Sequence, residues 1–375
     1  MANPVMIVAA KEFKDYLSSK RFLLIFAVLL LICIAAIIAG VSSYNSQLSA
    51  YNADVSRAST STQGGFAFQP TFPSMMLIFE SFAASFVTVG WILAIAIGFD
   101  LISKEKETGS LKLLLARPTF RDSIINGKIL GSTAILIVAL GGTFLVALAL
   151  LLLEGITPAG DDLIRLVAFF VMLVLISLAF LAVAIAASAI SKNSTLAILL
   201  AIGFVVFSLL VPSFSSSVSN ILLGTAPSAM ITSAATGSGS SGSGSTSYTG
   251  GPGGAGGVGG AVIQYNSSSG RGEVRMQVNP AYTAYINKQN TIIEAMDLVS
   301  PTSDLSDISA VVVDRQSSPD ATSNLAGVFD LRGVTSTPTL GSSIGSILPQ
   351  IISLLVITIV GFVISYAKFI RMDVR

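Results

Sequence analysis

The chain has 375 residues, of which 52% are hydrophobic and only 11% are charged, whereas a soluble domain carries about a quarter charged residues. Much of the chain must therefore dissolve in lipid. A net charge of +1 gives no overall field for nucleic acid. The absence of histidine removes the commonest general base and zinc ligand, so no catalytic residue and no metal site is predicted. The single cysteine, Cys33, lies in an apolar run, where we expect a buried thiol without a disulfide.

Residues 1–21 are predicted to form an amphipathic helix along the cytoplasmic membrane surface. Between Val5 and Ser19, apolar residues recur at spacings of three and four, with charged residues between them. This stripe comprises Met6, Ala9, Ala10, Phe13, Tyr16 and Leu17. A solvated tail does not explain the stripe. A cleaved signal peptide is disfavoured because about twenty residues precede the first long apolar run.

Six apolar stretches are long enough to cross a membrane, which takes about 20 apolar residues in a helix. They cover residues 22–41, 78–99, 129–153, 163–190, 195–212 and 344–367. The fifth has an open end, because Pro212 and a serine run interrupt a pattern that can continue to Leu223. No charge lies at the centre of a predicted span, which argues against a proton-coupled carrier. The expected fold is therefore an all-α polytopic membrane protein with six transmembrane helices.

Basic residues give the orientation, since they are retained on the cytoplasmic side near span ends. Fourteen of the 21 lie before span one, between spans two and three, in the turn between spans four and five, or after span six. We therefore expect a multi-pass plasma-membrane protein whose N- and C-termini, including the tail 368–375, are cytoplasmic.

Two segments are predicted to lie outside the cell. Residues 42–76 form a polar loop with little to bury. The larger segment, 213–343, contains a flexible Gly/Ser-rich linker at 236–260.

After the linker, the alternation from Glu273 to Val278 predicts a strand, and Tyr282 to Val299 has helical spacing that ends before Pro301. Residues 309–313 fit either a short strand or a helix end. We expect a small, partly ordered α+β insertion between helices five and six. Asn266 opens a sequon and is a candidate acceptor for glycosylation.

The stretch 100–128, between spans two and three, is too long for a turn. Residues 103–116 mix lysine and glutamate with leucine, which predicts a helix that breaks near Gly109 and ends at Pro118. Thr119 and Asp122 are a weak N-cap signal for a second helix that runs into span three. We expect a helical elbow at the cytoplasmic surface with charged groups able to meet a partner. A solvated cytoplasmic face is the alternative.

In this elbow the sequence resembles permease subunits of ABC transporters of the ABC-2 family. Members have an amphipathic N-terminal helix, six spans and, after span two, an ordered pattern of acidic, Gly-Leu, Arg-Pro, Arg and Gly-Lys positions. Here the pattern reads Asp100, Glu105, Gly109, Leu111, Leu114, Leu115, Arg117, Pro118, Arg121, Gly127 and Lys128. The resemblance runs from the N-terminal helix through span five and resumes at span six, but it fails over the large outer segment.

The resemblance implies a pair of permease subunits, expected to be a homodimer, on two copies of an ABC ATP-binding subunit. The elbow would be the coupling helix that docks on the ATPase. The implied interface is Asp100, Lys104, Glu105, Glu107, Gly109, Leu111, Arg117, Pro118 and Arg121. The chain has no phosphate-binding loop of the form Gly-x4-Gly-Lys-Ser/Thr, so it is not expected to be an enzyme or to hold a cofactor. ATP and Mg²⁺ would bind the partner; membrane lipid is the other expected partner.

Two functions remain open on the sequence. The first is the permease subunit of an ATP-driven exporter. The second is a membrane-anchored scaffold or mechanical transmitter. It would act, without bulk transport, on an extracytoplasmic partner that docks on residues 213–343.

Overall fold

A computed structural model describes residues 4–60, 73, 75–109, 121–158, 160–227, 280–305, 308, 345 and 347–371. These residues are mostly helical, and no strand occurs among them. The chain divides into two compact units, residues 1–210 with 298–375, and residues 211–297. The all-α polytopic membrane fold expected from the sequence is confirmed.

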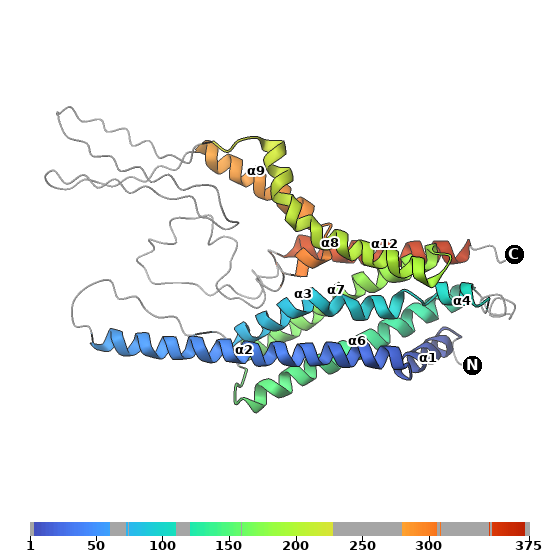
Figure 1. Cartoon of the computed structure of the whole chain (residues 1–375), viewed down its shortest axis with the longest axis horizontal. Coiled ribbons are helices and arrows are strands. Elements are labelled where there is room, and N and C mark those ends of the chain that lie inside the picture. The colour runs from blue at the N-terminus through green and yellow to red at the C-terminus, as the bar shows by residue number, and fades with distance from the viewer. Residues whose placement is uncertain are drawn as a thin grey trace. The chain divides into compact units, whose positions relative to one another are not determined.

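The N-terminal amphipathic helix is α1, Pro4–Leu17, which is followed by α2, Lys20–Thr60 (Figure 1). The helix α2 continues 19 residues past the predicted end of span one at Val41, where we expected a loop. No glycine or proline lies between Val41 and Thr60 to stop it. The hydroxyls of Ser46 and Ser49 donate to backbone carbonyls four residues earlier. The polar composition of this stretch marks the end of the lipid-soluble part, not the end of the helix.

The remaining spans follow the predicted order. They are α3, Met76–Gly98; α6, Arg121–Leu153; α7, Gly160–Ile190; α8, Ser194–Leu223; and α12, Leu348–Ile370. In the described part of the chain, α2, α6, α7, α8 and α12 are long and apolar enough to cross a membrane. Span two is a bent pair, Ile78–Phe86 and Thr88–Glu107, with a 45° angle between its halves. If the pair counts as one crossing, the six predicted spans are all present.

The helix of span five is the longer of the two alternatives, because α8 continues through Pro212 to Leu223. A proline has no N–H for the carbonyl four residues earlier, which is that of Ser208. In the structure the Ser208 carbonyl accepts hydrogen bonds from the hydroxyls of Ser300, at 2.7 Å, and Thr302, at 3.1 Å. Both hydroxyls are buried. A stretch within the predicted outer segment 213–343 therefore supplies donors to the carbonyl that lacks its helical partner.

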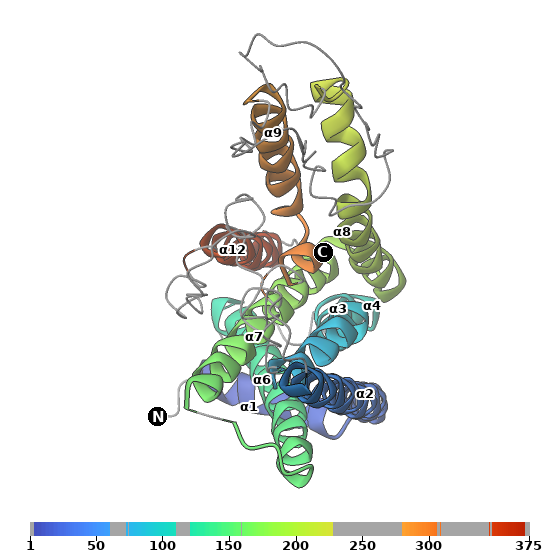
Figure 2. The same cartoon turned by 90° about the vertical axis from the view of Figure 1, so that its left-hand side faces the viewer.

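The helix α7 occupies the centre of the larger unit, with α12 on one side and α3 and α6 on the others (Figure 2). Small residues permit close approach of these helices. A Cβ atom on Gly98 of α3 would lie 2.7 Å from the Cβ atom of Ala184, and one on Gly361 of α12 would lie 2.9 Å from the backbone of Ala182. Ala182 and Ala184 of α7 are therefore packing residues, whereas Gly203 of α8 has open space beside it.

In the smaller unit, the predicted helix at 282–299 is found as α9, Pro280–Asp297. Its Tyr285 hydroxyl donates to the Gly224 carbonyl at 3.0 Å, and the Gln289 amide donates to Asn220 at 2.9 Å. The strand expected at 273–278, the segment 309–313, the linker 236–260 and Asn266 lie outside the described residues. The β component of the insertion is therefore not supported.

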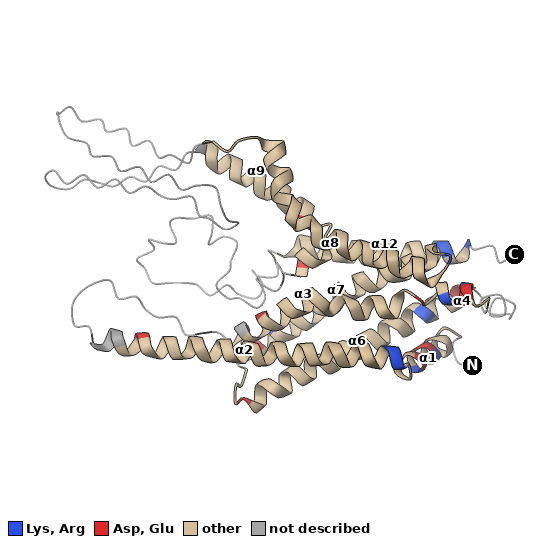
Figure 3. Cartoon of the chain, viewed as in Figure 1, with Lys and Arg blue, Asp and Glu red and all other residues tan. Residues whose placement is uncertain are grey.

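Basic residues gather at one end of the larger unit. The ends marked N and C and the short helix α4, Ser103–Glu107, lie together there. Figure 3 shows Lys and Arg at this same end, while the long middle parts of the helices are free of charged colouring. We call this the basic end.

Candidate functional site

The candidate site is the described part of the elbow, residues 100–109 and 121–128, with the helix ends around it. The helix α4 ends at Glu107, and Gly109 follows with φ of 71°, a left-handed conformation that favours glycine. Ahead of α4, the backbone N–H groups of Ile102 and Ser103 both donate to the Ser188 hydroxyl oxygen, at 3.0 and 2.9 Å. This buried serine lies in the last turn of α7, so the start of α4 is tied to the end of span four.

A buried ion triad joins three elements at the basic end. The Lys128 Nζ atom of α6 lies 2.8 Å from Glu12 Oε1 of α1 and 2.8 Å from Glu105 Oε1 of α4. The lysine side chain is 3% exposed and the two carboxylates are 13% and 19% exposed. Charge-assisted hydrogen bonds of this length are strong when they are shielded from water. The other oxygen of Glu105, Oε2, is buried without a hydrogen-bond partner in the described structure.

The next two residues of α4 contact the ends of two transmembrane helices. The Lys106 Nζ atom donates to the carbonyls of Ala189 at 2.6 Å, Ser191 at 2.9 Å and Ser188 at 3.4 Å, where α7 ends. The Glu107 carboxylate accepts from the backbone N–H and the hydroxyl of Ser194, at 3.3 and 3.0 Å, where α8 begins. A cation at a helix C-terminus and an anion at an N-terminus both complement the helix dipole and satisfy unpaired backbone groups.

The helix α1 packs on α6 through two glycines. A Cβ atom on Gly127 would lie 2.6 Å from Val8 Cβ, and one on Gly131 would lie 2.7 Å from the Ala9 carbonyl oxygen. Gly127 is one position of the family pattern in the sequence. The structure adds a physical reason, because any larger side chain at these two positions would separate α1 from α6.

The predicted stripe of α1 divides between two surroundings. Ala9 is buried and Phe13 and Tyr16 pack against the core, whereas Met6 and Leu17 are exposed. The Tyr16 hydroxyl donates to the Ile97 carbonyl near the end of α3 at 2.6 Å. Burial, together with the nearby carboxylates of Asp100, Glu12 and Glu105, raises the pKa of Tyr16 well above its usual value. The phenol therefore stays protonated and keeps its role as donor.

The other predicted site residues are placed as follows. Asp100 is half-buried just after α3, and Lys104 is exposed on α4. Arg121 begins α6, but its side chain is outside the described structure, as are Leu111, Leu114, Leu115, Arg117 and Pro118. The roles of all these residues in partner binding stay predictions.

Sequence reasoning missed Glu12, Lys106, Ser188 and Ser194 as members of this site. Glu12 carried one usable signal, because it lies three residues after Ala9 and four before Tyr16, on the buried face of α1. The sequence held no signal for the contacts of Lys106 with α7, because these contacts join residues more than 80 positions apart.

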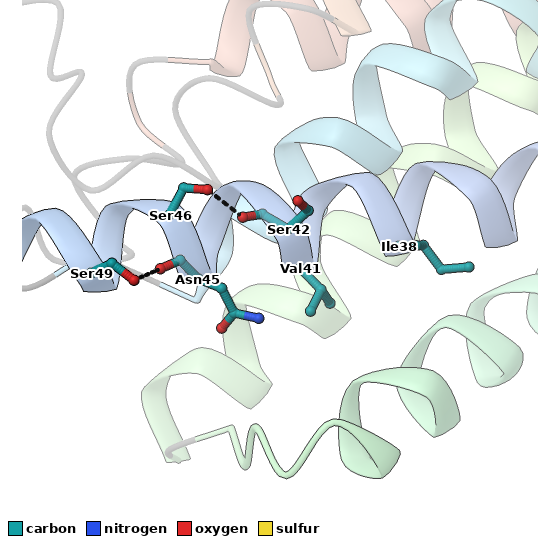
Figure 4. Close-up of a pocket in the computed structure, with 6 residues that line it drawn as sticks. All are labelled: Ile38, Val41, Ser42, Asn45, Ser46 and Ser49. Atoms are coloured by element: carbon teal, nitrogen blue, oxygen red, sulfur yellow. Dashed lines mark hydrogen bonds between the residues drawn. The ribbon is translucent and has the colours of Figure 1, made fainter.

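A hollow of about 420 Å³ lies on the outer part of α2 (Figure 4). All six residues that line it belong to this helix: Ile38, Val41, Ser42, Asn45, Ser46 and Ser49. The Ser46 and Ser49 hydroxyls already donate to the α2 backbone. The hollow is thus a feature of one helix surface without polar groups from several elements, unlike a typical small-molecule site. Among the described residues, no group of three His, Cys, Asp or Glu side chains could hold a metal ion.

The arrangement at the basic end is suited to mechanical work. Charged and hydroxyl groups of one short segment hold α1, α6, α7 and α8 together.

A family model described as "ABC-2 family transporter protein" matches residues 6–374. No curated protein matches the chain.

Proposed function

The chain belongs to the ABC-2 family of transporter proteins, and from this premise we propose that it is the permease of an ATP-driven exporter whose elbow receives force from separate ATP-binding subunits. Family membership makes the chain a multi-pass permease subunit of an ABC transporter, which associates with an ATP-binding subunit. The direction of transport, the coupling to ATP and the residues that carry it are the proposal.

One observation carries the proposal: α4 contacts α6, α7 and α8 directly, and it is joined to α1 through Lys128. A solvated loop without fixed contacts could move without displacing the transmembrane helices. Force applied to α4 would pass through the buried Lys128 triad to α1 and α6, and through Lys106 and Glu107 to α7 and α8. A switching element needs such discrete contacts if a local event is to move packed helices.

The charges at the basic end support a cytoplasmic position for the elbow. Lysine and arginine near span ends are retained in the cytoplasm, and this end carries both termini and α4. The proposal therefore puts the elbow on the side where ATP is available. ATP and Mg²⁺ would bind the partner subunit, not this chain.

We further propose two copies of the chain with two ATP-binding subunits. In the most apolar 18-residue window of each helix, only 22% is buried in α8 and α12, against 56% in α7. The exposed apolar faces are available to lipid or to a second copy. Native mass spectrometry of the purified complex should give two of each subunit.

The test is co-purification from native membranes. The tagged chain should retain a nucleotide-hydrolysing subunit, and Lys104→Glu, which reverses an exposed charge of α4, should weaken this association. The matched control is Glu154→Lys, which reverses an exposed charge after α6 at the opposite end of the bundle. Retention that is equal in both variants contradicts the docking role of α4. Absence of any ATP-binding subunit from the parent chain favours the scaffold or mechanical transmitter instead.

Export is tested in cells that express the complex. A partner subunit with its phosphate-binding lysine replaced should abolish release of the transported compound into the medium and raise its level inside. The opposite change would indicate import.

A further inference from the structure

Two neighbouring residues of opposite charge, Lys106 and Glu107, contact the two sides of one tight turn. The turn, Ser191–Asn193, separates the last residue of α7, Ile190, from the first residue of α8, Ser194. The lysine reaches the carbonyl end of α7 and the glutamate reaches the N–H end of α8. Each charge therefore meets the helix end of opposite partial charge.

The donors and acceptors match in number as well as in sign. An ammonium group has three N–H donors, and Lys106 Nζ has three carbonyl partners, those of Ser188, Ala189 and Ser191. These carbonyls belong to the last turn of α7 and the residue after it, where helical partners run out. Glu107 accepts from both the backbone and the side chain of Ser194.

A third contact attaches the start of α4 to the last turn of α7, just before the turn Ser191–Asn193. The Ser188 hydroxyl oxygen accepts the N–H groups of Ile102 and Ser103, which precede Lys106. Ser188 and Ser103 are both fully buried. The start and the end of α4 are thus both attached to the junction of spans four and five.

We propose that Lys106 and Glu107 are positioning residues that clamp the α7–α8 turn to α4, so that the turn and the elbow move as one body. In this assignment Glu107 acts on Ser194 of its own chain, and force reaches spans four and five directly, without passing through span three. The coupling role rests on the proposed function; the clamp itself does not.

The sharpest perturbation exchanges the two charges, Lys106→Glu with Glu107→Lys. This variant keeps the composition and net charge but puts an anion at the carbonyl end of α7 and a cation at the N–H end of α8. Lys106→Arg keeps the donors and serves as the rescue. Lys14→Gln, which removes an exposed charge of α1, controls for a general loss of charge at the basic end.

The first experiment uses the purified full chain with Cys33→Ala, so that introduced cysteines carry the only labels. Spin labels at Lys104 and Lys192, both exposed, report the distance between α4 and the turn. We expect a single narrow distribution in the parent, in Lys106→Arg and in Lys14→Gln. The charge exchange should at least double its width. An unchanged width in the charge-exchanged chain refutes the clamp.

The second experiment uses the complex with its ATP-binding subunit. Labels at Asp122 of α6 and Lys192 should change their distance when nucleotide is trapped. In the charge-exchanged complex, with nucleotide trapped to the same extent as in the parent complex, the change in distance should fall by at least half. A full change there refutes the transmission role. If no ATP-binding subunit associates with the parent chain, the proposed function fails, while the first experiment still decides the clamp.

Discussion

Replacing Lys128 by methionine should destabilise the larger unit by about 3 kcal/mol, the lower end of the range for breaking a buried ion pair. Each 2.8 Å contact of Lys128 with a carboxylate corresponds to roughly 6 kcal/mol of gross attraction at an effective dielectric constant of about 20. Most of that attraction offsets the removal of three charges from water. Methionine fills a similar volume but leaves Glu12 and Glu105 facing each other without a cation. The lower end applies because these carboxylates keep 13% and 19% exposure and can partly rehydrate.

The assay is unfolding of the purified chain by titration of mixed micelles with SDS, followed by the fluorescence of Trp91, the only tryptophan. The triple variant, in which Glu12 and Glu105 also become glutamine, should recover most of the lost free energy, because no charge is then left unpaired. Lys14→Met, at an exposed position on α1, should stay within about 0.5 kcal/mol of the parent. A loss below about 0.5 kcal/mol for Lys128→Met, or no recovery in the triple variant, would refute the reasoning.

Three further outcomes follow from the packing. Gly131→Val should lower the free energy of unfolding by about 2 kcal/mol in the same titration, because its Cβ atom would meet the Ala9 carbonyl oxygen at 2.7 Å. Gly203→Ala is the matched control: Gly203 has open space around it, so this substitution should be neutral or stabilise the chain by up to about 1 kcal/mol. Tyr16→Phe should lower the free energy of unfolding by about 1 kcal/mol at neutral pH. Because the pKa of Tyr16 is raised in the folded chain, this difference between parent and variant is fully present below about pH 10 and shrinks as the pH rises towards the folded pKa. Unfolding at several pH values from 8 to 11 would measure it. Cys33, which is buried, should resist a water-soluble maleimide in intact membranes and react fully after unfolding in SDS, as gel shifts would show.

The number and order of the spans were predictable because lipid imposes a single strong requirement. An apolar run of about 20 residues has few structures open to it other than a helix across the membrane. The predicted ends at Leu153 and Ile190 coincide with the ends of α6 and α7, where charged or polar residues follow at once. The same requirement does not fix where a helix ends in water, which is why α2 exceeds its predicted span.

The long-range contacts of the site were not predictable from one sequence. The family pattern placed Glu105 in the elbow. A glutamate at this position fits an exposed contact with a partner as well as a buried ion pair with Lys128, so the residue type alone does not separate the two roles. The distinction depends on Glu12, which lies 116 positions from Lys128 in the chain. Helical periodicity shows which face of α1 is buried and not what covers that face. Only the structure shows that this face of α1 packs against Gly127 and Gly131 of α6.

The packing of α7 explains why contacts at the basic end matter for the whole bundle. Interdigitated helices in contact through Gly98, Gly361 and the alanines of α7 leave no space for small local adjustments. A displacement of the last turn of α7 must therefore either be resisted or move α3 and α12 together with it. Lys106 is bonded to that turn, and Lys128 connects the same short helix to α6 and α1. Both routes begin at neighbouring residues of α4, Glu105 and Lys106. The proposed coupling therefore predicts that a displacement of α4 moves the core helices together, as a transporter that alternates between two discrete states requires.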